Sequence, residues 1–169
     1  MKYGFRGFTL VELLLYISIS SVILLVSSLF LSSLLESRIK NQTILEVEQQ
    51  GVRIMQDITQ IARNSEEITL PVQGGSGSSI TFDVADAGDD PIVFDLAGGV
   101  IRISKGGGSA ISLTNSRVTA SNLTFQNLTR TGTPGTIKIS FTLSHVNPDG
   151  RNEYSYSKTF YSSATLRWP

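Results

Sequence analysis

The chain has 169 residues, no cysteine and a formal net charge of zero, because 14 Lys and Arg balance 14 Asp and Glu. Balanced charge gives no indication of nucleic-acid binding, which usually needs clustered positive charge. The absence of cysteine excludes disulfides, thiolate nucleophiles and sulfur-ligated zinc.

A long apolar stretch dominates the start of the chain. Residues 13–35 contain neither a charge nor proline, and about twenty such residues form a helix that can cross a bilayer. Lys2 and Arg6 precede this stretch, so the positive-inside rule predicts a cytoplasmic N-terminus and an extracytoplasmic head. Glu12 lies at the start of the span, where a buried charge costs about 2.5–3.5 kcal/mol and needs a partner.

A short basic leader ending in glycine, then FTLVE at residues 8–12 and the apolar stretch, resembles the type III signal of type IV pilins and type II secretion pseudopilins. The resemblance implies that a prepilin peptidase cuts after Gly7 and that the new terminal amine, on Phe8, is methylated. It also implies that Glu12 pairs with the terminal amine of a neighbouring subunit during assembly. An ammonium group and a carboxylate in lipid stabilise each other, which agrees with this role.

The same resemblance implies the partners and the location of the chain. The partners would be other pilin or pseudopilin subunits through the N-terminal helix, prepilin peptidase, an inner-membrane assembly platform and membrane lipid. The chain would be a single-pass protein of the inner membrane that is built into a pilus or pseudopilus. No nucleic-acid partner and no cofactor are expected, and extrusion would depend on a separate ATPase, because the chain has no nucleotide-binding motif.

Serine is frequent in the apolar stretch. Small hydroxyl residues let membrane helices approach closely and bond across to a neighbour. The alternative is that each hydroxyl bonds back to its own helix, and the sequence favours neither. Major pilins often carry a proline where this chain has Leu29, so a straighter helix is expected here.

The helical pattern continues beyond the span and becomes amphipathic. One helix is predicted from about residue 8 to residue 64, with an apolar stripe that packs on a sheet. Gly51 costs this helix about 1 kcal/mol relative to alanine. It marks a close approach to the sheet or a bend, or it is simply a tolerated glycine. The predicted stripe consists of Ile44, Val47, Gly51, Ile54, Ile58 and Ile61.

After the helix the pattern changes to short alternating strands. A glycine- and serine-rich segment at residues 73–79 is predicted to be a flexible loop, and clusters of Gly, Asp, Asn and Pro separate the strands that follow. An antiparallel sheet is therefore expected. The predicted strands cover residues 79–84, 92–96, 100–104, 110–114, 122–128, 136–146 and 153–161.

The clearest pair of strands forms a long hairpin around a turn at residues 147–150, and one face of it should form the core of the head. The predicted fold class is α+β: a long N-terminal helix, membrane-spanning in its first half and amphipathic in its second, packed on an antiparallel β-sheet head as in the pilin lollipop. The predicted divisions are a leader at 1–7, an assembly helix at 8–35, an amphipathic helix at 36–65 and a head at 66–169. The inward residues of the hairpin are predicted to be Ile137, Ile139, Phe141, Leu143, Tyr154, Tyr156 and Phe160.

The C-terminal layout resembles a subgroup of the same family. A glycine-rich middle, the segment at residues 113–125, the long hairpin and the closing SSATLR at residues 162–167 are similar in order and spacing to J-type minor pseudopilins and related minor pilins. That subunit joins other minor pseudopilins in a complex at the filament tip. Glu12 disfavours the extreme tip subunit, which commonly lacks this carboxylate. Many major pilins close this region with a disulfide, whereas this chain must hold it by packing alone.

Catalysis and metal binding have little support. The sole histidine, His145, is interpreted as a surface or turn residue without an acid at a meaningful spacing, so the chain is predicted not to be an enzyme. An acidic cluster around residues 87–88 has enough oxygen ligands for a calcium ion, but it lacks EF-hand spacing, and a solvated acidic turn is the simpler interpretation. The cluster consists of Asp83, Asp86, Asp89 and Asp90.

Two classes of function remain. In the first, the chain is a minor pilin or pseudopilin, a structural subunit of a type IV pilus, a type II secretion pseudopilus or a competence filament. In the alternative, the anchor is incidental and the head is an extracytoplasmic binding module, either an adhesin or a DNA-uptake receptor. DNA uptake would need a basic strip, but the cations of the head are scattered among the strands: Arg102, Lys105, Arg117, Arg130 and Lys138.

Overall fold

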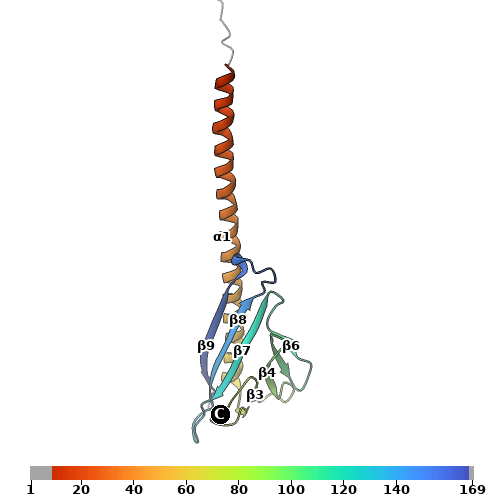
Figure 1. Cartoon of the computed structure of the whole chain (residues 1–169). Coiled ribbons are helices and arrows are strands. Elements are labelled where there is room, and N and C mark those ends of the chain that lie inside the picture. The colour runs from red at the N-terminus through yellow and green to blue at the C-terminus, as the bar shows by residue number, and fades with distance from the viewer. Residues whose placement is uncertain (1–8, 168–169) are drawn as a thin grey trace, which may run out of the picture.

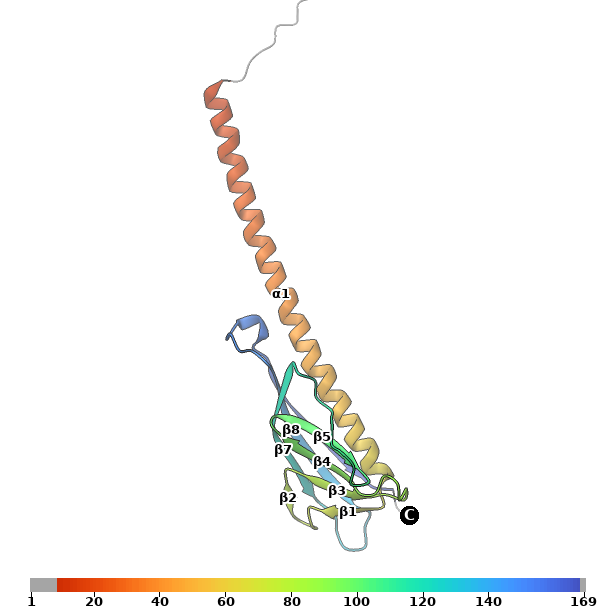
Figure 2. The ribbon, with the colours of Figure 1, turned by 90° about the vertical axis from the view of Figure 1, so that its right-hand side faces the viewer.

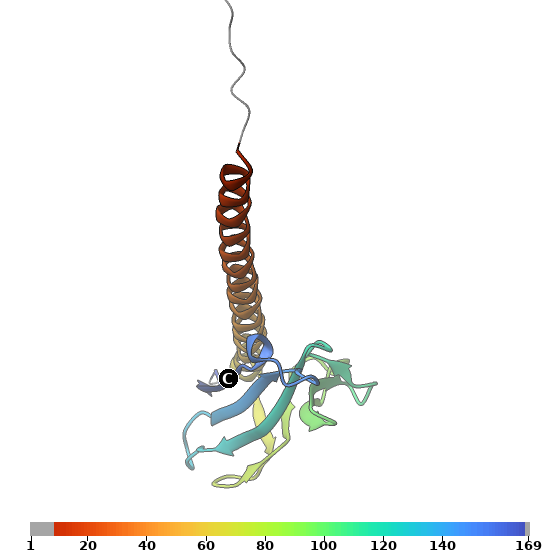
Figure 3. The same cartoon turned by 45° about the horizontal axis from the view of Figure 1, so that its top comes forward.

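A computed structural model of the chain describes residues 9–167. One helix, α1 (Leu10–Asn64), projects from a β-rich head, and only its second half lies against that head (Figure 1). The tilted view in Figure 3 shows the first half as an unaccompanied rod. The predicted α+β lollipop is confirmed, and the helix passes Leu29 without interruption.

The head consists of two antiparallel sheets and one short 3-10 helix, η1. Its elements are β1 (Glu67–Leu70), β2 (Ser76–Gly77), β3 (Ile80–Asp83), β4 (Ile92–Ala97), β5 (Val100–Lys105), β6 (Ile111–Ser112), β7 (Val118–Asn127), β8 (Thr136–His145), η1 (Asn152–Tyr154) and β9 (Ser157–Thr165). The five-stranded sheet has the order β1-β3-β4-β5-β6, and the four-stranded sheet has the order β2-β7-β8-β9. Their inward faces and α1 share one hydrophobic core.

The strand predictions need four corrections. β1 was not predicted, and the predicted flexible loop at residues 73–79 contains β2, in which Ser76 pairs with Gln126. β7 begins at Val118 rather than at residue 122. The returning strand begins only at Ser157, so Tyr154 lies in η1 and Tyr156 in the connection. In the first three, pairing with a neighbouring strand extends or creates a strand against local propensity. In the fourth, residues 153–156 have strand-forming side chains but lie outside the β8–β9 ladder, which begins at Ser157.

The face of α1 that contacts the head is rotated slightly from the predicted one. Ile44 and Ile61 are half-buried beside the stripe rather than within it. Small residues replace them because the helix packs closely on β8 and β9, which leaves little room for long side chains. The buried stripe consists of Thr43, Val47, Gly51, Ile54, Ile58 and Ala62.

Gly51 marks the closest approach of the helix to the sheet. A Cβ added at this position would lie 2.1 Å from Cζ of Phe160. The Phe160 ring in turn stacks on Phe141 of β8, with ring centroids 5.4 Å apart. The close-approach interpretation of Gly51 is therefore confirmed, and the interpretation as a merely tolerated glycine is wrong.

The C-terminal strand is closed onto the helix without a disulfide. Leu166 is buried, and its backbone N–H donates to the Gly135 carbonyl at 2.8 Å. The next residue, Arg167, donates its backbone N–H to the Arg63 carbonyl in the last turn of α1 at 3.1 Å. Packing and backbone hydrogen bonds thus hold the end of the chain at the end of the head farthest from the start of α1 (Figure 2).

Gly51→Ala is expected to lower the free energy of unfolding of the full-length protein by about 1–3 kcal/mol, because the new methyl group forces the Phe160 ring out of its site. Helix propensity alone predicts the opposite sign, a gain of about 1 kcal/mol. Thermal unfolding in detergent measures the difference. Val52→Ala, on the exposed side of the same helix turn, is the control and should change stability little. A stabilised Gly51→Ala variant would contradict the close approach.

Candidate functional site

The start of α1 carries Glu12 in a capped first turn. Thr9 is the N-cap, and its Oγ1 accepts the backbone N–H of Glu12 at 3.2 Å. The Thr9 carbonyl accepts the N–H of Leu13 at 3.1 Å. A carboxylate in the first turn also interacts favourably with the helix dipole. The predicted cleavage and methylation residues, Gly7 and Phe8, lie outside the described residues, as do Lys2 and Arg6.

Glu12 therefore contributes to the stability of the first turn of α1, in addition to its predicted role in assembly. The spacing of Thr9 and Glu12 is that of a capping box, a signal that the sequence contained and that the sequence analysis missed. The Glu12 side chain is exposed and makes no ion pair with any residue between 9 and 167. Within the described part of the subunit its charge thus remains available to a group on another molecule.

The first half of α1 presents an apolar surface that nothing in the subunit covers. The large hydrophobic side chains from Leu10 to Leu35 are between 50 % and 76 % exposed. By length and composition this part of α1 can cross a membrane, since its uncharged stretch is about 35 Å long at about 1.5 Å per residue. Such a surface is not stable in water and requires lipid or other apolar helices.

The serines of the span divide into two groups. Ser18 donates its hydroxyl to the Leu14 carbonyl, and Ser21 donates to the Ser18 carbonyl, each at 2.8 Å. For these two, local bonding to the helix backbone is confirmed. The remaining serines of residues 18–33 make no side-chain hydrogen bond within the described chain, so their hydroxyls stay available to a neighbouring helix.

The head begins where the apolar stretch ends. Lys40, five residues beyond the end of the uncharged stretch at Leu35, donates from Nζ to the carbonyls of Asn152 and Ser155 at 2.9 and 2.6 Å. These bonds tie η1 to α1 and make η1 the part of the head nearest the apolar half of the helix (Figure 2). The head therefore sits directly at the boundary of the span, with almost no free linker.

His145 ends β8 beside the turn, as predicted, but it is not a freely exposed surface residue. Its side chain is only 10 % exposed, and Nε2 lies 3.8 Å from a carboxylate oxygen of Glu46 on α1. The ring stacks on Tyr154 with centroids 5.6 Å apart, while Arg117 reaches the same Glu46 at 3.5 Å. Because Glu46 and His145 are far apart in the chain, their spacing gave no signal. These contacts join the flank of the helix to the end of β8.

A second polar contact joins α1 to β9. Glu48 accepts hydrogen bonds from Lys158 at 2.8 Å and from the Tyr156 hydroxyl at 3.2 Å. The Lys158 bond is the main cause that lowers the pKa of Glu48, and the same bond raises the pKa of Lys158. Burial, followed by the bond to Glu48, raises the pKa of Tyr156. The polar contacts of Glu46 and Glu48 thus flank the buried stripe and fix the helix on the sheet.

The acidic cluster does not form a common ligand set. Asp89 pairs with Lys105 at 2.5 Å, and an oxygen of Asp86 accepts the Gly88 N–H at 2.9 Å. Among residues 9–167, no three carboxylate or histidine side chains are placed to hold a metal ion together. Asp83 and Asp90 instead form a like-charge pair, and Asp90 is the main cause that raises the pKa of Asp83.

Several cations considered for DNA binding are neutralised by partners. Arg102 forms two bonds to Asp95, at 2.5 and 2.9 Å, and Lys105 and Arg117 have the acidic partners described above. Paired cations contribute little net field at a distance. These pairs give no support to a continuous basic strip on the head.

Residues 3–28 match the prokaryotic N-terminal methylation motif. This is the prepilin-type signal of type IV pilins and pseudopilins, and it covers both the predicted cleavage residues and Glu12. No curated protein and no solved structure matches the chain.

Asp83→Asn is expected to raise the melting temperature at neutral pH. Asp90 is the main cause that raises the pKa of Asp83 in the folded state, followed by burial and by Glu66 and Glu67 at the adjacent strand β1. The protonated carboxyl group of Asp83 therefore stabilises the folded state at acid pH, and this contribution is lost as the pH rises through the raised pKa. The gain from asparagine should shrink as the pH falls through the acidic range, where wild-type Asp83 becomes protonated.

Thermal unfolding of the full-length protein across a pH series measures this difference. Asp149→Asn, in the turn before η1, removes a negative charge far from the cluster and is the matched control. Equal gains from the two substitutions, or a gain that persists at acid pH, would contradict the like-charge pair.

Proposed function

Because residues 3–28 carry the methylation motif, we propose that this chain is a minor pilin or pseudopilin, a structural subunit that prepilin peptidase processes after Gly7 and that is built into a filament through α1. The observation that carries the proposal is the motif followed directly by an exposed apolar helix with Glu12 in its first turn.

The geometry of α1 supports two successive environments for its first half. Before assembly, lipid covers the apolar surface of residues 10–35, and afterwards the helices of neighbouring subunits replace the lipid. In either setting the Glu12 carboxylate lies in a medium of low dielectric constant, where pairing with the Phe8 ammonium of a neighbour offsets much of its cost. This pairing also sets the axial position of one helix relative to the next.

The proposed role is mechanical rather than catalytic. The polar groups that the head brings together, at Glu46 and Glu48, join the helix to the sheet. Each of these groups lies between α1 and the strands packed on it, so they do not line a substrate site. We propose a place among the minor subunits, in a tip or initiation complex, on the order and spacing of the C-terminal segments alone.

Mass spectrometry of the membrane-extracted protein tests the processing step. In cells with a functional prepilin peptidase, the protein is expected to begin at N-methylated Phe8, whereas in cells without the peptidase it should retain residues 1–7. Gly7→Leu should remain uncut in both, and it controls for unrelated proteolysis. A leader that stays intact in both strains would overturn the proposal and favour a signal-anchored binding module.

Glu12→Gln tests assembly separately from insertion and processing. Glutamine keeps a side-chain oxygen that can take part in the capping box but removes the charge. The variant is expected to be inserted and cut normally and to appear in sheared filaments at a level at least about tenfold lower, because the ion pair in lipid is lost. Glu36→Gln, just beyond the span, is the matched control and should assemble normally. Normal assembly of Glu12→Gln would contradict the pairing.

A further inference from the structure

The connection between β8 and β9, residues 146–156, contains η1 and is the part of the head nearest the apolar half of α1 (Figure 2). We call this connection the proximal loop. A pocket of about 310 Å³ has η1 on one side and helix residues between 36 and 41 on the other. The proximal loop therefore lies level with the first helical turns that follow the uncharged stretch.

Hydrogen bonds fix the proximal loop at this height. Lys40 holds η1 to α1 through the two bonds from its Nζ. Within the loop, the Asn147 side chain closes the turn, since its Oδ1 accepts the Arg151 N–H at 2.9 Å and its Nδ2 donates to the Arg151 carbonyl at 2.8 Å. The loop is therefore tied to α1 and is not a free tether.

The height of the proximal loop can be compared with the dimensions of a bilayer. Leu35 is the last residue of the uncharged stretch, and Glu36 is the first charge after it. At about 1.5 Å per residue, residues 36–41 extend from about 1.5 to about 9 Å beyond Leu35. The headgroup layer on each side of the hydrocarbon core is about 5–7 Å thick. With the span in a membrane, the loop is thus at the level of the lipid headgroups.

The side chains around the proximal loop suit the headgroup layer. Tyr154 is an amphipathic aromatic residue, of the kind that is enriched at membrane–water interfaces, and Val146 is 40 % exposed. Arg151 pairs with Glu153 and is still 53 % exposed, so it can also reach a phosphate. The charges at this level are balanced, so a contact with lipid does not depend on net charge. They are Arg38, Lys40 and Arg151 against Glu36, Asp149 and Glu153.

We propose that the proximal loop is a second membrane contact of the subunit and rests on the phospholipid headgroups while α1 spans the bilayer. The inference rests on the membrane span of the proposed function and goes beyond it, because it assigns a lipid-binding surface to the head. The contact stops α1 from sinking deeper, since polar groups of the loop would then enter hydrocarbon at a high cost. Assembly into a filament would draw the loop off the headgroups, so the contact belongs to the unassembled subunit.

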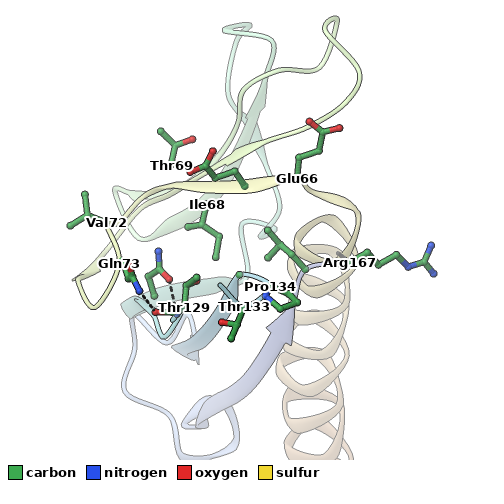
Figure 4. Close-up of a pocket in the computed structure, with 13 residues that line it drawn as sticks. Glu66, Ile68, Thr69, Val72, Gln73, Thr129, Thr133, Pro134 and Arg167 are labelled. Atoms are coloured by element: carbon green, nitrogen blue, oxygen red, sulfur yellow. Dashed lines mark hydrogen bonds between the residues drawn. The ribbon is translucent and has the colours of Figure 1, made fainter. Parts of the chain in front are cut away.

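Fluorescence quenching of the full-length protein in phospholipid nanodiscs tests this contact. Because the chain has no cysteine, one introduced cysteine gives one labelled site. A label on Asp149→Cys, in the proximal loop, is expected to be strongly quenched by lipid that carries a nitroxide on its headgroup. Thr131→Cys is the matched control and its label should be unaffected. Thr131 is also exposed, in the loop between β7 and β8 at the far end of the head, which borders a pocket of about 460 Å³ (Figure 4).

A helical insertion tests the dependence on height. Seven residues, AEAAAKA, placed between Leu35 and Glu36 add about 10.5 Å and close to two complete turns, so the head keeps its orientation and lies beyond the headgroup layer. The label on Asp149→Cys is then expected to lose most of its quenching. A label on Ser27→Cys, within the span, should be quenched by lipid with a nitroxide on its acyl chain, with or without the insertion, and reports that α1 still crosses the bilayer.

The balanced charges give a further expectation. Quenching of the label on Asp149→Cys should persist in nanodiscs of zwitterionic lipid alone and at high salt, because the height of the loop and not net charge places it among the headgroups.

Four outcomes would overturn the proposal. They are an unquenched label on Asp149→Cys, equal quenching of the label on Thr131→Cys, quenching that survives the insertion, and a contact that needs anionic lipid or low salt. None of these affects the span itself, which the label on Ser27→Cys reports separately. An unquenched label on Ser27→Cys would instead contradict the span and with it the proposed function, so the two failures are distinguishable.

Discussion

The uncovered apolar surface of α1 is the constraint on which the rest of the structure depends. Because residues 10–35 have no partner within the subunit, this half of the helix must remain in lipid or among other helices. The head must therefore fold while it is held at the end of a membrane-embedded rod. The Lys40 bonds to η1 place that head directly at the boundary, so any movement of the helix along its axis moves the head with it.

A rigid connection between helix and head follows from how the two halves of α1 differ. The second half supplies one side of the core, with Gly51 against Phe160, and polar contacts at Glu46 and Glu48 flank this buried stripe. Core packing resists separation of helix and sheet, while the flanking contacts resist rotation of the helix about its own axis. A force applied to α1 is transmitted to the head only if both kinds of contact are present. Without the core packing the helix would separate from the sheet, and without the flanking contacts it would rotate against it.

The sequence predicted those parts of the fold that rest on local patterns. The end of the helix and the hairpin core from Ile137 to Leu143 were visible as periodicity. At Gly51 the sequence left a close approach, a bend and a tolerated glycine open, and only the structure decides between them. β2 was not, because a glycine-rich segment becomes a strand only when the edge of β7 is there to pair with it. The contact between His145 and Glu46 was equally invisible, since it joins residues far apart in the chain.

The start of α1 and the far end of the head lie at opposite ends of the molecule (Figure 1). From Glu12 to the last turn of α1 the helix alone extends for about 75 Å, at about 1.5 Å per residue. No described residue contacts both ends, and substitutions so far apart act independently in general. In the proposed assembly, contacts between subunits would therefore constrain the first half of α1. The far end of the head would not be constrained by those contacts, because the rest of the helix separates the two.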